Sequence, residues 1–315
     1  MIIKKIIEKL QLLSGVEVFE DYDLTSMTTL GLRSKAQLFL KIKSERALIE
    51  VISLFSDTQL KYLVIGKGSN LILPEQISKP VIQLSFDIPL DDLSVLKDEY
   101  TLPGNTPLNI LTGRAIKHGL RGWEAFTGIP ASLGGAIWMN AGTSLGEIGS
   151  LVKEVKFLKA SGEIVNHVVQ AGDFYYRGNN FLNDGDIVIS ATLKHNGVED
   201  CISREIIAYL RKRSKSQPLT KKTCGCTFKN IAQLQSGGTK PCVAGKVIDI
   251  LGLKGLRYKD LVISPVHGNF IENHGSANQD DFLDFVSKIN SRIEEAYDHT
   301  FEMEAIIYND KPPSS

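Results

Sequence analysis

The residues at 128–142 read Gly128-Ile129-Pro130-Ala131-Ser132-Leu133-Gly134-Gly135-Ala136-Ile137-Trp138-Met139-Asn140-Ala141-Gly142. Small residues alternate with large apolar ones, and one proline fixes the start of the segment. Glycine loses helix and strand stability but permits close backbone approach and positive φ. We therefore expect a backbone that lies flat against something large. The alternative is a tight turn followed by a buried helix that packs through its small residues.

A second glycine-rich segment, Gly66-Lys67-Gly68-Ser69-Asn70, comes about sixty residues earlier and directly after an apolar run at 61–65. Successive backbone N–H groups in such a loop bind phosphate oxygens. The spacing is not G-x-G-x-x-G and no Walker lysine pattern is present, so neither a Rossmann site nor a P-loop is supported. A hairpin-like turn is the alternative. Together, the two segments suit a flavin dinucleotide, with one at the pyrophosphate and the other against the rings.

Length and charge restrict the class of protein. The chain has 315 residues, which predicts two domains, and 43% hydrophobic residues, enough for a real core. Lys+Arg and Asp+Glu are both 36, so a nucleic-acid partner is not expected.

No window reaches the ~18 apolar residues of a membrane span, and the lysines at 4–9 lie inside the apolar run, unlike a signal peptide. We expect an N-terminal amphipathic helix in a cytoplasmic protein without a membrane partner. No oligomeric state follows from these features.

The cysteines are Cys201, Cys224, Cys226 and Cys242. They are too few for a disulfide framework in a chain of this size. Zinc sites favour C-x-x-C spacing, whereas Cys224 and Cys226 form a C-x-C pair. No metal site is therefore predicted.

Periodicity predicts a mixed order of strands and helices. Strands are expected at 36–42, 61–65, 71–73, 81–84, 155–158, 164–165, 186–193 and 301–307. Helices are expected from a cap at Ser44 to residue 57, and at 107–119, 199–215 and 282–296. A hairpin turn is expected at 161–162 and a loose tail at 311–315. This order is typical of an α+β fold and not of regular βαβ alternation.

The motifs resemble, in order and over about residues 25–308, the UDP-N-acetylenolpyruvoylglucosamine reductase family. The resemblance rests on the two glycine-rich segments and on Thr28-Thr29-Leu30, Tyr176-Arg177, Gly225-Cys226-Thr227-Phe228-Lys229-Asn230, Ala244-Gly245-Lys246-Val247-Ile248-Asp249, Gly252-Leu253-Lys254-Gly255, His267-Gly268-Asn269-Phe270-Ile271 and Glu302-Met303-Glu304. The short span between Arg177 and Cys226 favours the subgroup without an extra tyrosine-bearing loop. Arg33-Ser34-Lys35, Ile231 and Gly268 depart from the family pattern and put local loop shape in doubt.

The resemblance implies an α+β fold with a two-lobed FAD-binding domain of the PCMH, or vanillyl-alcohol-oxidase, type. An N-terminal helix and lead-in at 1–25 would precede this domain at 26–197, and an α+β substrate-binding domain would follow at 198–315. FAD would be held non-covalently, because the first glycine loop has neither histidine nor cysteine. The expected cofactor-binding residues are Gly66, Lys67, Gly68, Ser69, Asn70, Gly128, Ile129, Pro130, Gly134, Gly135, Asn140 and Gly142.

The implied reaction is the NADPH-driven reduction of UDP-N-acetylglucosamine enolpyruvate to UDP-N-acetylmuramate, a peptidoglycan precursor. Hydride addition to the enol ether moves electrons toward its carboxylate, where a cation is needed. Arg177 matches the family's catalytic arginine, and its fork suits a carboxylate. Glu304 matches the catalytic glutamate. Without the resemblance, a surface arginine and a solvated glutamate would be the simpler interpretations.

Cys226 stands where the family usually has the serine that protonates the intermediate. A thiol has a reference pKa near ~8.5 and is a stronger acid than an aliphatic hydroxyl, so it can replace serine as proton donor. Cys224 would then be a bystander or an oxidation partner. Tyr176, Lys229 and Asn230 match substrate-contacting positions.

Three alternatives stay open at this point. The basic residues between 211 and 222 are read first as a solvated surface and second as an attraction for anionic substrates. The chain could be another non-covalent FAD oxidoreductase of the same fold. It could also be a non-catalytic UDP-sugar-binding or metal-binding module.

Overall fold

The computed structural model describes residues 2–231 and 243–310, with side chains from residue 4 onward. The chain forms two compact units. Unit 1 comprises Met1–Asp21, Leu38–Lys67 and Lys79–Leu210, and unit 2 comprises Tyr22–Gln37, Gly68–Ser78 and Arg211–Ser315. These units are discontinuous in sequence, unlike the continuous domains expected above, which stay a prediction. Cys242 and the tail at 311–315 lie outside the described residues.

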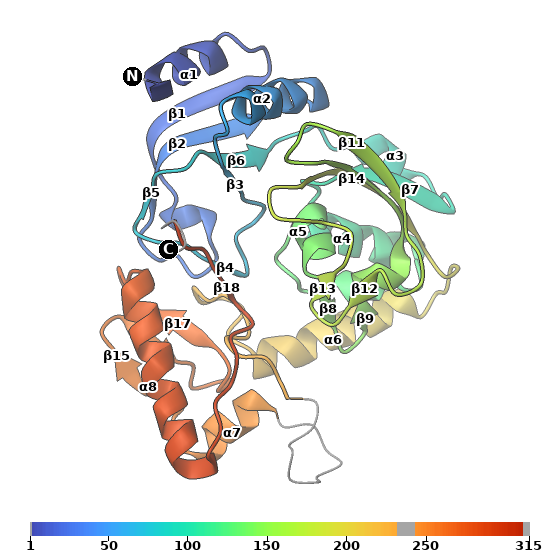
Figure 1. Ribbon diagram of the computed structural model, residues 1–315. Coiled ribbons are helices and arrows are strands. Elements are labelled where there is room, and N and C mark those ends of the chain that lie inside the picture. The colour runs from blue at the N-terminus through green and yellow to red at the C-terminus, as the bar shows by residue number, and fades with distance from the viewer. Residues whose placement is uncertain (1, 232–242, 311–315) are drawn as a thin grey trace. The chain divides into compact units, whose positions relative to one another are not determined.

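The first lobe of unit 1 is built on a sheet with the order β1-β2-β6-β3 (Figure 1). Its strands are β1 (Val16–Asp23), β2 (Lys35–Ile42), β6 (Val81–Leu84) and β3 (Leu63–Val64), and β6 pairs in parallel with both β2 and β3. Helices α1 (Ile2–Gln11) and α2 (Glu45–Asp57) share its buried core. Ser44 begins α2 as predicted, because its side chain accepts the backbone N–H of Ala47 at 3.2 Å.

The second lobe of unit 1 contains an antiparallel sheet with the order β11-β10-β14-β7. The strands are β11 (Ile164–Val168), β10 (Val152–Leu158), β14 (Ile187–Lys194) and β7 (Glu99–Pro103). Helices α4 (Leu108–His118) and α5 (Leu133–Trp138) contribute to its core around the fully buried Trp123. The predicted turn at 161–162 joins β10 to β11, and Gly162 has φ +89°.

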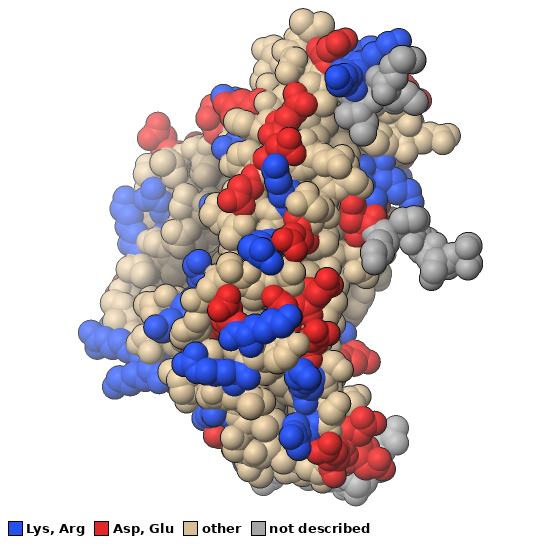
Figure 2. Space-filling model, turned by 90° about the vertical axis from the view of Figure 1, so that its left-hand side faces the viewer, with Lys and Arg blue, Asp and Glu red and all other residues tan. Residues whose placement is uncertain are grey.

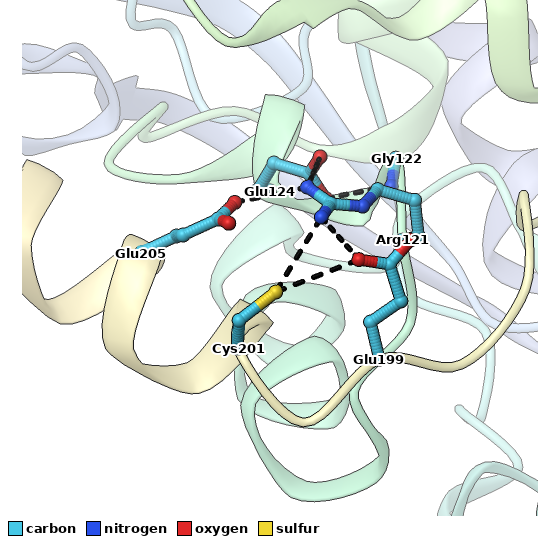
Figure 3. A network of polar contacts seen from close by, with 6 residues as sticks. All are labelled: Arg121, Gly122, Glu124, Glu199, Cys201 and Glu205. Atoms are coloured by element: carbon cyan, nitrogen blue, oxygen red, sulfur yellow. Dashed lines mark hydrogen bonds and ion pairs between the residues drawn. The ribbon is translucent and has the colours of Figure 1, made fainter.

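Helix α6 (Ile202–Ser216) is anchored to unit 1 through Arg121 (Figure 3). The Arg121 guanidinium contacts Glu199, lies 2.9 Å from Glu205 and lies 3.5 Å from Glu124. The helix was predicted from residue 199, which is three residues too early. The reason is that the chain up to residue 199 pairs with the segment 119–121, through the Leu120–Val198 bridge and the Glu199 N–H bond to the Gly119 carbonyl at 2.8 Å.

Unit 2 surrounds α8 (Gln279–Tyr297), which begins with a capping box between Asn278 and Asp281. A sheet of β15 (Arg257–Tyr258), β16 (Leu261–Ile263) and β17 (Ile271–Asn273) packs with it in one core. β4 (Leu71–Ile72) pairs in parallel with β18 (Ile306–Ile307). The predicted strand at 301–307 is therefore too long, since only its end joins a ladder.

The remaining elements are short. They are α3 (Leu90–Ser94), α7 (Ala244–Ile250), β5 (Gln76–Ile77), β8 (Gly142–Thr143), β9 (Gly146–Glu147), β12 (Phe174–Tyr175), β13 (Gly178–Asn179), and the 3-10 turns Thr25–Met27, Trp123–Phe126 and Ile148–Leu151.

Acidic and basic side chains alternate over most of the face shown in Figure 2, in keeping with the net charge of zero. In the part of the chain that the structure describes, no helix is long and apolar enough to cross a membrane. The absence of nucleic-acid and membrane partners stays a prediction.

Candidate active site

Within unit 1, Gly66 of the first glycine-rich segment lies against Ser132 of the second. A Cβ added at Gly66 would lie 2.4 Å from the Oγ atom of Ser132, which leaves no room for a side chain at residue 66. Ser132 is itself buried and precedes α5. Gly66, which follows β3, and Ser132, which precedes α5, are therefore in close contact.

The loop at 66–70 presents a run of backbone donors. Counting only acceptors in residues 2–231 and 243–310, none of its N–H groups donates a backbone hydrogen bond. Gly68 has φ +57°, and its carbonyl accepts the Thr29 N–H at 3.2 Å. A Cβ at Gly68 would lie 2.3 Å from the Met27 carbonyl oxygen, so glycine is needed where the Thr28-Thr29 signature lies against the loop. A curved run of N–H donors suits the phosphates of a dinucleotide.

Two further polar groups beside the start of α5 support this fit. The Leu133 N–H donates to the Thr106 carbonyl at 2.8 Å, and the Gly134 N–H donates to the Gly104 carbonyl at 2.7 Å. Next to these bonds, Asn105 Oδ1 and Thr106 Oγ1 are buried and have no hydrogen-bond partner among the described residues. Buried polar atoms rarely stay unpaired, so a polar ligand is the natural partner. The sequence interpretation missed both residues, although the turn Gly104-Asn105-Thr106-Pro107 before α4 was a signal.

The second segment combines both interpretations offered for it. Gly134 lies inside the fold, because a Cβ there would be 3.2 Å from the Gly104 carbonyl oxygen and 3.3 Å from the Val188 side chain. Gly135 and Pro130 are exposed, so they remain available to a ligand. The segment is therefore a tight turn and a buried helix whose outer side presents small residues.

Arg177 lies in unit 1, in the two-residue turn between β12 and β13, where Tyr175 pairs with Gly178. Its backbone has φ +61°, and its Nη1 atom donates to the Gly142 carbonyl at 3.5 Å. The guanidinium lies 5.0 Å from the ring centre of Tyr176, which is 53% exposed. Tyr176 and Arg177, which are predicted to contact the substrate, therefore form the tip of a short hairpin.

Asn140 differs from the other predicted cofactor residues. It is 2% exposed, and protein groups occupy both N–H donors and the carbonyl of its side chain. Its side chain is thus engaged inside unit 1, and the predicted cofactor contact could come only from its backbone.

Cys226 and Glu304 are brought together in unit 2. The Glu304 N–H donates to the carbonyl of Thr227, the neighbour of Cys226, at 2.8 Å. Asn70 Nδ2 donates to the Glu304 carbonyl at 3.1 Å and fixes the other side of the same peptide segment. Both Cys226 and Glu304 are partly exposed, so their side chains can reach a ligand.

Cys224 lies close to this pair but belongs to the core. It is 3% exposed, and burial raises its pKa to about 12, with smaller contributions that include the charges of Cys226 and Glu304. A buried thiol of this kind is inert. Neither Cys224 nor Cys226 forms a disulfide in the described structure.

The two predicted substrate residues in unit 2 also have structural contacts. Lys229 Nζ lies 3.2 Å from a Glu302 carboxylate oxygen, in an exposed ion pair. Asn230 Oδ1 accepts the backbone N–H of Ala244 at 3.1 Å and so holds the start of α7. Only their remaining donors are available to a ligand.

Comparison with known proteins gives matches over both parts of the chain. Residues 36–167 match an FAD binding domain, and residues 217–308 match the C-terminal domain of UDP-N-acetylenolpyruvoylglucosamine reductase. The reductase of Bacillus licheniformis is 30% identical over 313 residues, covering 98% of this chain and 99% of the relative. That of Chlamydia pneumoniae is 31% identical over 292 residues, covering 91% of each.

The fold agrees with a solved structure as well. The crystal structure of the Thermus caldophilus reductase has a TM-score of 0.74 and 31% identity, and the match covers 93% of this chain and 99% of that one. The family is therefore established over nearly the whole length of the chain, in both the flavin-binding part and the C-terminal part. This chain belongs to the UDP-N-acetylenolpyruvoylglucosamine reductase family.

Proposed function

We propose that Arg177, Cys226 and Glu304 are the catalytic side chains with which this FAD- and NADPH-dependent reductase converts UDP-N-acetylglucosamine enolpyruvate into UDP-N-acetylmuramate. The observation that carries the proposal is the pairing of two segments in unit 2. Cys226 has a partly exposed thiol and Glu304 a partly exposed carboxyl. The two segments that carry these residues are joined by the hydrogen bond from the Glu304 N–H to the Thr227 carbonyl. The neighbouring Cys224 is buried, so Cys226 is the thiol available for proton transfer.

The loop at 66–70 and the turn at 104–107 each fit polar groups of a bound FAD. The donors at 66–70 would hold its phosphates, and Asn105 Oδ1 and Thr106 Oγ1 would bond its polar groups. When bound, FAD accepts hydride from NADPH and supplies it to the substrate. The loop contains no residue that would attach the flavin covalently.

Side chains of this protein stabilise the negative charge that develops on the substrate and supply the proton. As hydride reaches the terminal carbon of the enolpyruvyl group, negative charge grows on the carboxylate side of the substrate. The planar guanidinium of Arg177 binds such a carboxylate through two donors and stabilises that charge. The Cys226 thiol gives its proton to the adjacent carbon, and the Glu304 carboxyl assists in stabilising the intermediate.

Substrate recognition uses the same two parts of the chain. Tyr176 offers an exposed ring and hydroxyl beside Arg177. Lys229 would exchange its exposed ion pair with Glu302 for a substrate phosphate, and the Asn230 amide nitrogen would bond a sugar group. We place the reaction in the cytoplasm, where NADPH and nucleotide sugars are found.

Anaerobic stopped-flow spectroscopy on Cys226 variants tests the assignment. NADPH should bleach the flavin in Cys226→Ala as in the wild type, while reoxidation by the enolpyruvyl substrate is lost. Cys226→Ser should keep substantial reoxidation, because a hydroxyl can donate the same proton. Cys201→Ser, which changes a thiol in unit 1, is the matched control and should behave as the wild type. Normal reoxidation in Cys226→Ala would overturn the role of the thiol.

A further inference from the structure

The hairpin that carries Arg177 is attached to the rest of unit 1 by contacts from both of its strands. The Phe174 ring lies 2.6 Å from the position that a Cβ at Gly149 would take. Asn179 Nδ2 donates to the Trp138 carbonyl at 3.0 Å. Both strands of the hairpin are thus fixed on either side of its tip.

Asn140 is the centre of these contacts. Its Nδ2 atom donates to the Tyr175 carbonyl at 2.9 Å and to a Glu147 carboxylate oxygen at 2.9 Å. Its Oδ1 atom accepts the Gly149 N–H at 3.0 Å. Asparagine is one of the few residues that tolerate the φ of +42° found here. One buried amide therefore joins the hairpin strand to two neighbouring segments.

The β8–β9 hairpin, which Asn140 contacts through Glu147, also supplies the carbonyl that accepts a hydrogen bond from Arg177. Gly142 pairs with Glu147 across the β8–β9 hairpin, and a Cβ at Gly142 would lie 2.6 Å from the Glu147 side chain. The Gly142 carbonyl accepts Arg177 Nη1. Asn140 is thus linked to Arg177 in two ways. Its bond to Glu147 reaches the β8–β9 hairpin, whose Gly142 carbonyl accepts the guanidinium. Its bond to Tyr175 reaches the strand that leads into the Arg177 backbone.

We propose that Asn140 is a positioning residue that sets the place of Arg177 for the substrate, rather than a ligand of the flavin. This inference rests on the proposed function, since it assigns Arg177 to the oxidative half-reaction. Loss of the amide would leave the flavin site intact and displace the guanidinium. A displacement near 1 Å costs a reaction on the order of 100-fold, so a loss of at least about tenfold is expected.

Two substitutions isolate the amide. Asn140→Asp keeps the size, the backbone preference and the acceptor for the Gly149 N–H, but it has no N–H for the Tyr175 carbonyl or the Glu147 carboxylate, and it places a second carboxylate beside Glu147. Asn140→Gly removes the side chain and keeps the backbone at φ +42° unstrained. Asn273→Ala is the control for general destabilisation, because that amide is likewise buried, at 5% exposure, and its side chain bonds to backbone groups of unit 2 at Leu30, Gly31 and Gly275.

Both Asn140 variants should retain FAD, its absorption spectrum and the rate of bleaching by NADPH. Reoxidation by the enolpyruvyl substrate should fall at least about tenfold. Asn273→Ala, at an equal decrease in melting temperature, should keep the wild-type ratio of the two half-reactions. A changed flavin spectrum or weakened FAD retention in Asn140→Gly would overturn the proposal and support the flavin contact instead.

A double-mutant cycle with Arg177→Ala separates this inference from the proposed function. If Asn140 acts through Arg177, then Asn140→Asp should change the reoxidation rate of Arg177→Ala by less than about twofold. Independent, multiplying effects would refute the positioning role and leave the function intact. Wild-type reoxidation in Arg177→Ala alone would instead refute the proposed function.

Discussion

Gly68 offers the sharpest test of the contact between the glycine loop and the N-terminal signature. Replacement by alanine adds a Cβ that would lie 2.3 Å from the Met27 carbonyl oxygen and 2.9 Å from the Thr28 Cα atom. Both atoms belong to the backbone, so no flexible side chain can move away. The backbone of the loop or of Met27 must shift by about 0.7 Å to restore even the 3.0 Å that real Cβ atoms respect.

The loss of folding stability caused by Gly68→Ala has two parts, and a control variant separates them. A residue with a Cβ loses ~1–2 kcal/mol in the left-handed region, and the restricted unfolded chain offsets ~0.4–1 kcal/mol of this, leaving about 1 kcal/mol. Forcing atoms into a packed site adds ~1–3 kcal/mol, so Gly68→Ala should cost about 3 kcal/mol. Gly162→Ala, with φ +89° and nothing within 4 Å of the added Cβ, carries only the first part.

Thermal melts of the FAD-free proteins compare the two variants, and flavin retention on desalting reports the loop. Gly68→Ala should lower the melting temperature about three times as much as Gly162→Ala and should lose flavin. Gly162→Ala should retain flavin as the wild type does. Equal melting temperatures together with equal flavin retention would refute the argument that backbone proximity fixes glycine at residue 68.

Further expectations concern a helix cap, an ion-pair network and two thiols. Ser44→Ala should cost about 1 kcal/mol of the free energy of unfolding, measured by urea titration, because α2 loses its side-chain acceptor. Arg121 lowers the pKa of Glu199 below 4.5, so this pair stabilises the fold above pH 4.5 and less as the pH falls through the folded-state value. Melts of Arg121→Met and wild type should therefore converge in acid, and a constant difference would contradict this. Iodoacetamide followed by mass spectrometry should label Cys226 well before Cys224, whose pKa burial raises to about 12; equal labelling would contradict the buried position.

Local features of the fold could be predicted from the sequence because neighbouring residues determine them. Ser44 caps α2, Gly119 ends α4 with φ +66°, and Gly162 turns β10 into β11. Each depends on backbone preference or on one side chain that bonds within a few residues. The sequence also predicted a close backbone approach at the glycine-rich segment 128–142, but it did not predict that Gly66 lies against Ser132.

The parts that depend on distant contacts could not be predicted. The spacing of residues does not show that Asn140 bonds Glu147 and Tyr175, because three separate turns bring these groups together. Asn105 and Thr106 look like ordinary turn residues until their burial without a partner is known. The match to family motifs predicts catalytic roles for Arg177, Cys226 and Glu304, but it does not show which contacts hold these residues in place.

The composition of unit 2 has a consequence for how the chain folds during synthesis. Leu30, Leu32 and Ile72 lie in the core that α8 and the C-terminal strands complete, and β4 pairs with β18. These early residues therefore leave the ribosome long before their partners do, and a fragment made only of residues 211–315 would lack part of its own core. Synthesis must nearly finish before unit 2 can close, so the nascent chain exposes these apolar side chains, and this is the stage at which a chaperone would be needed.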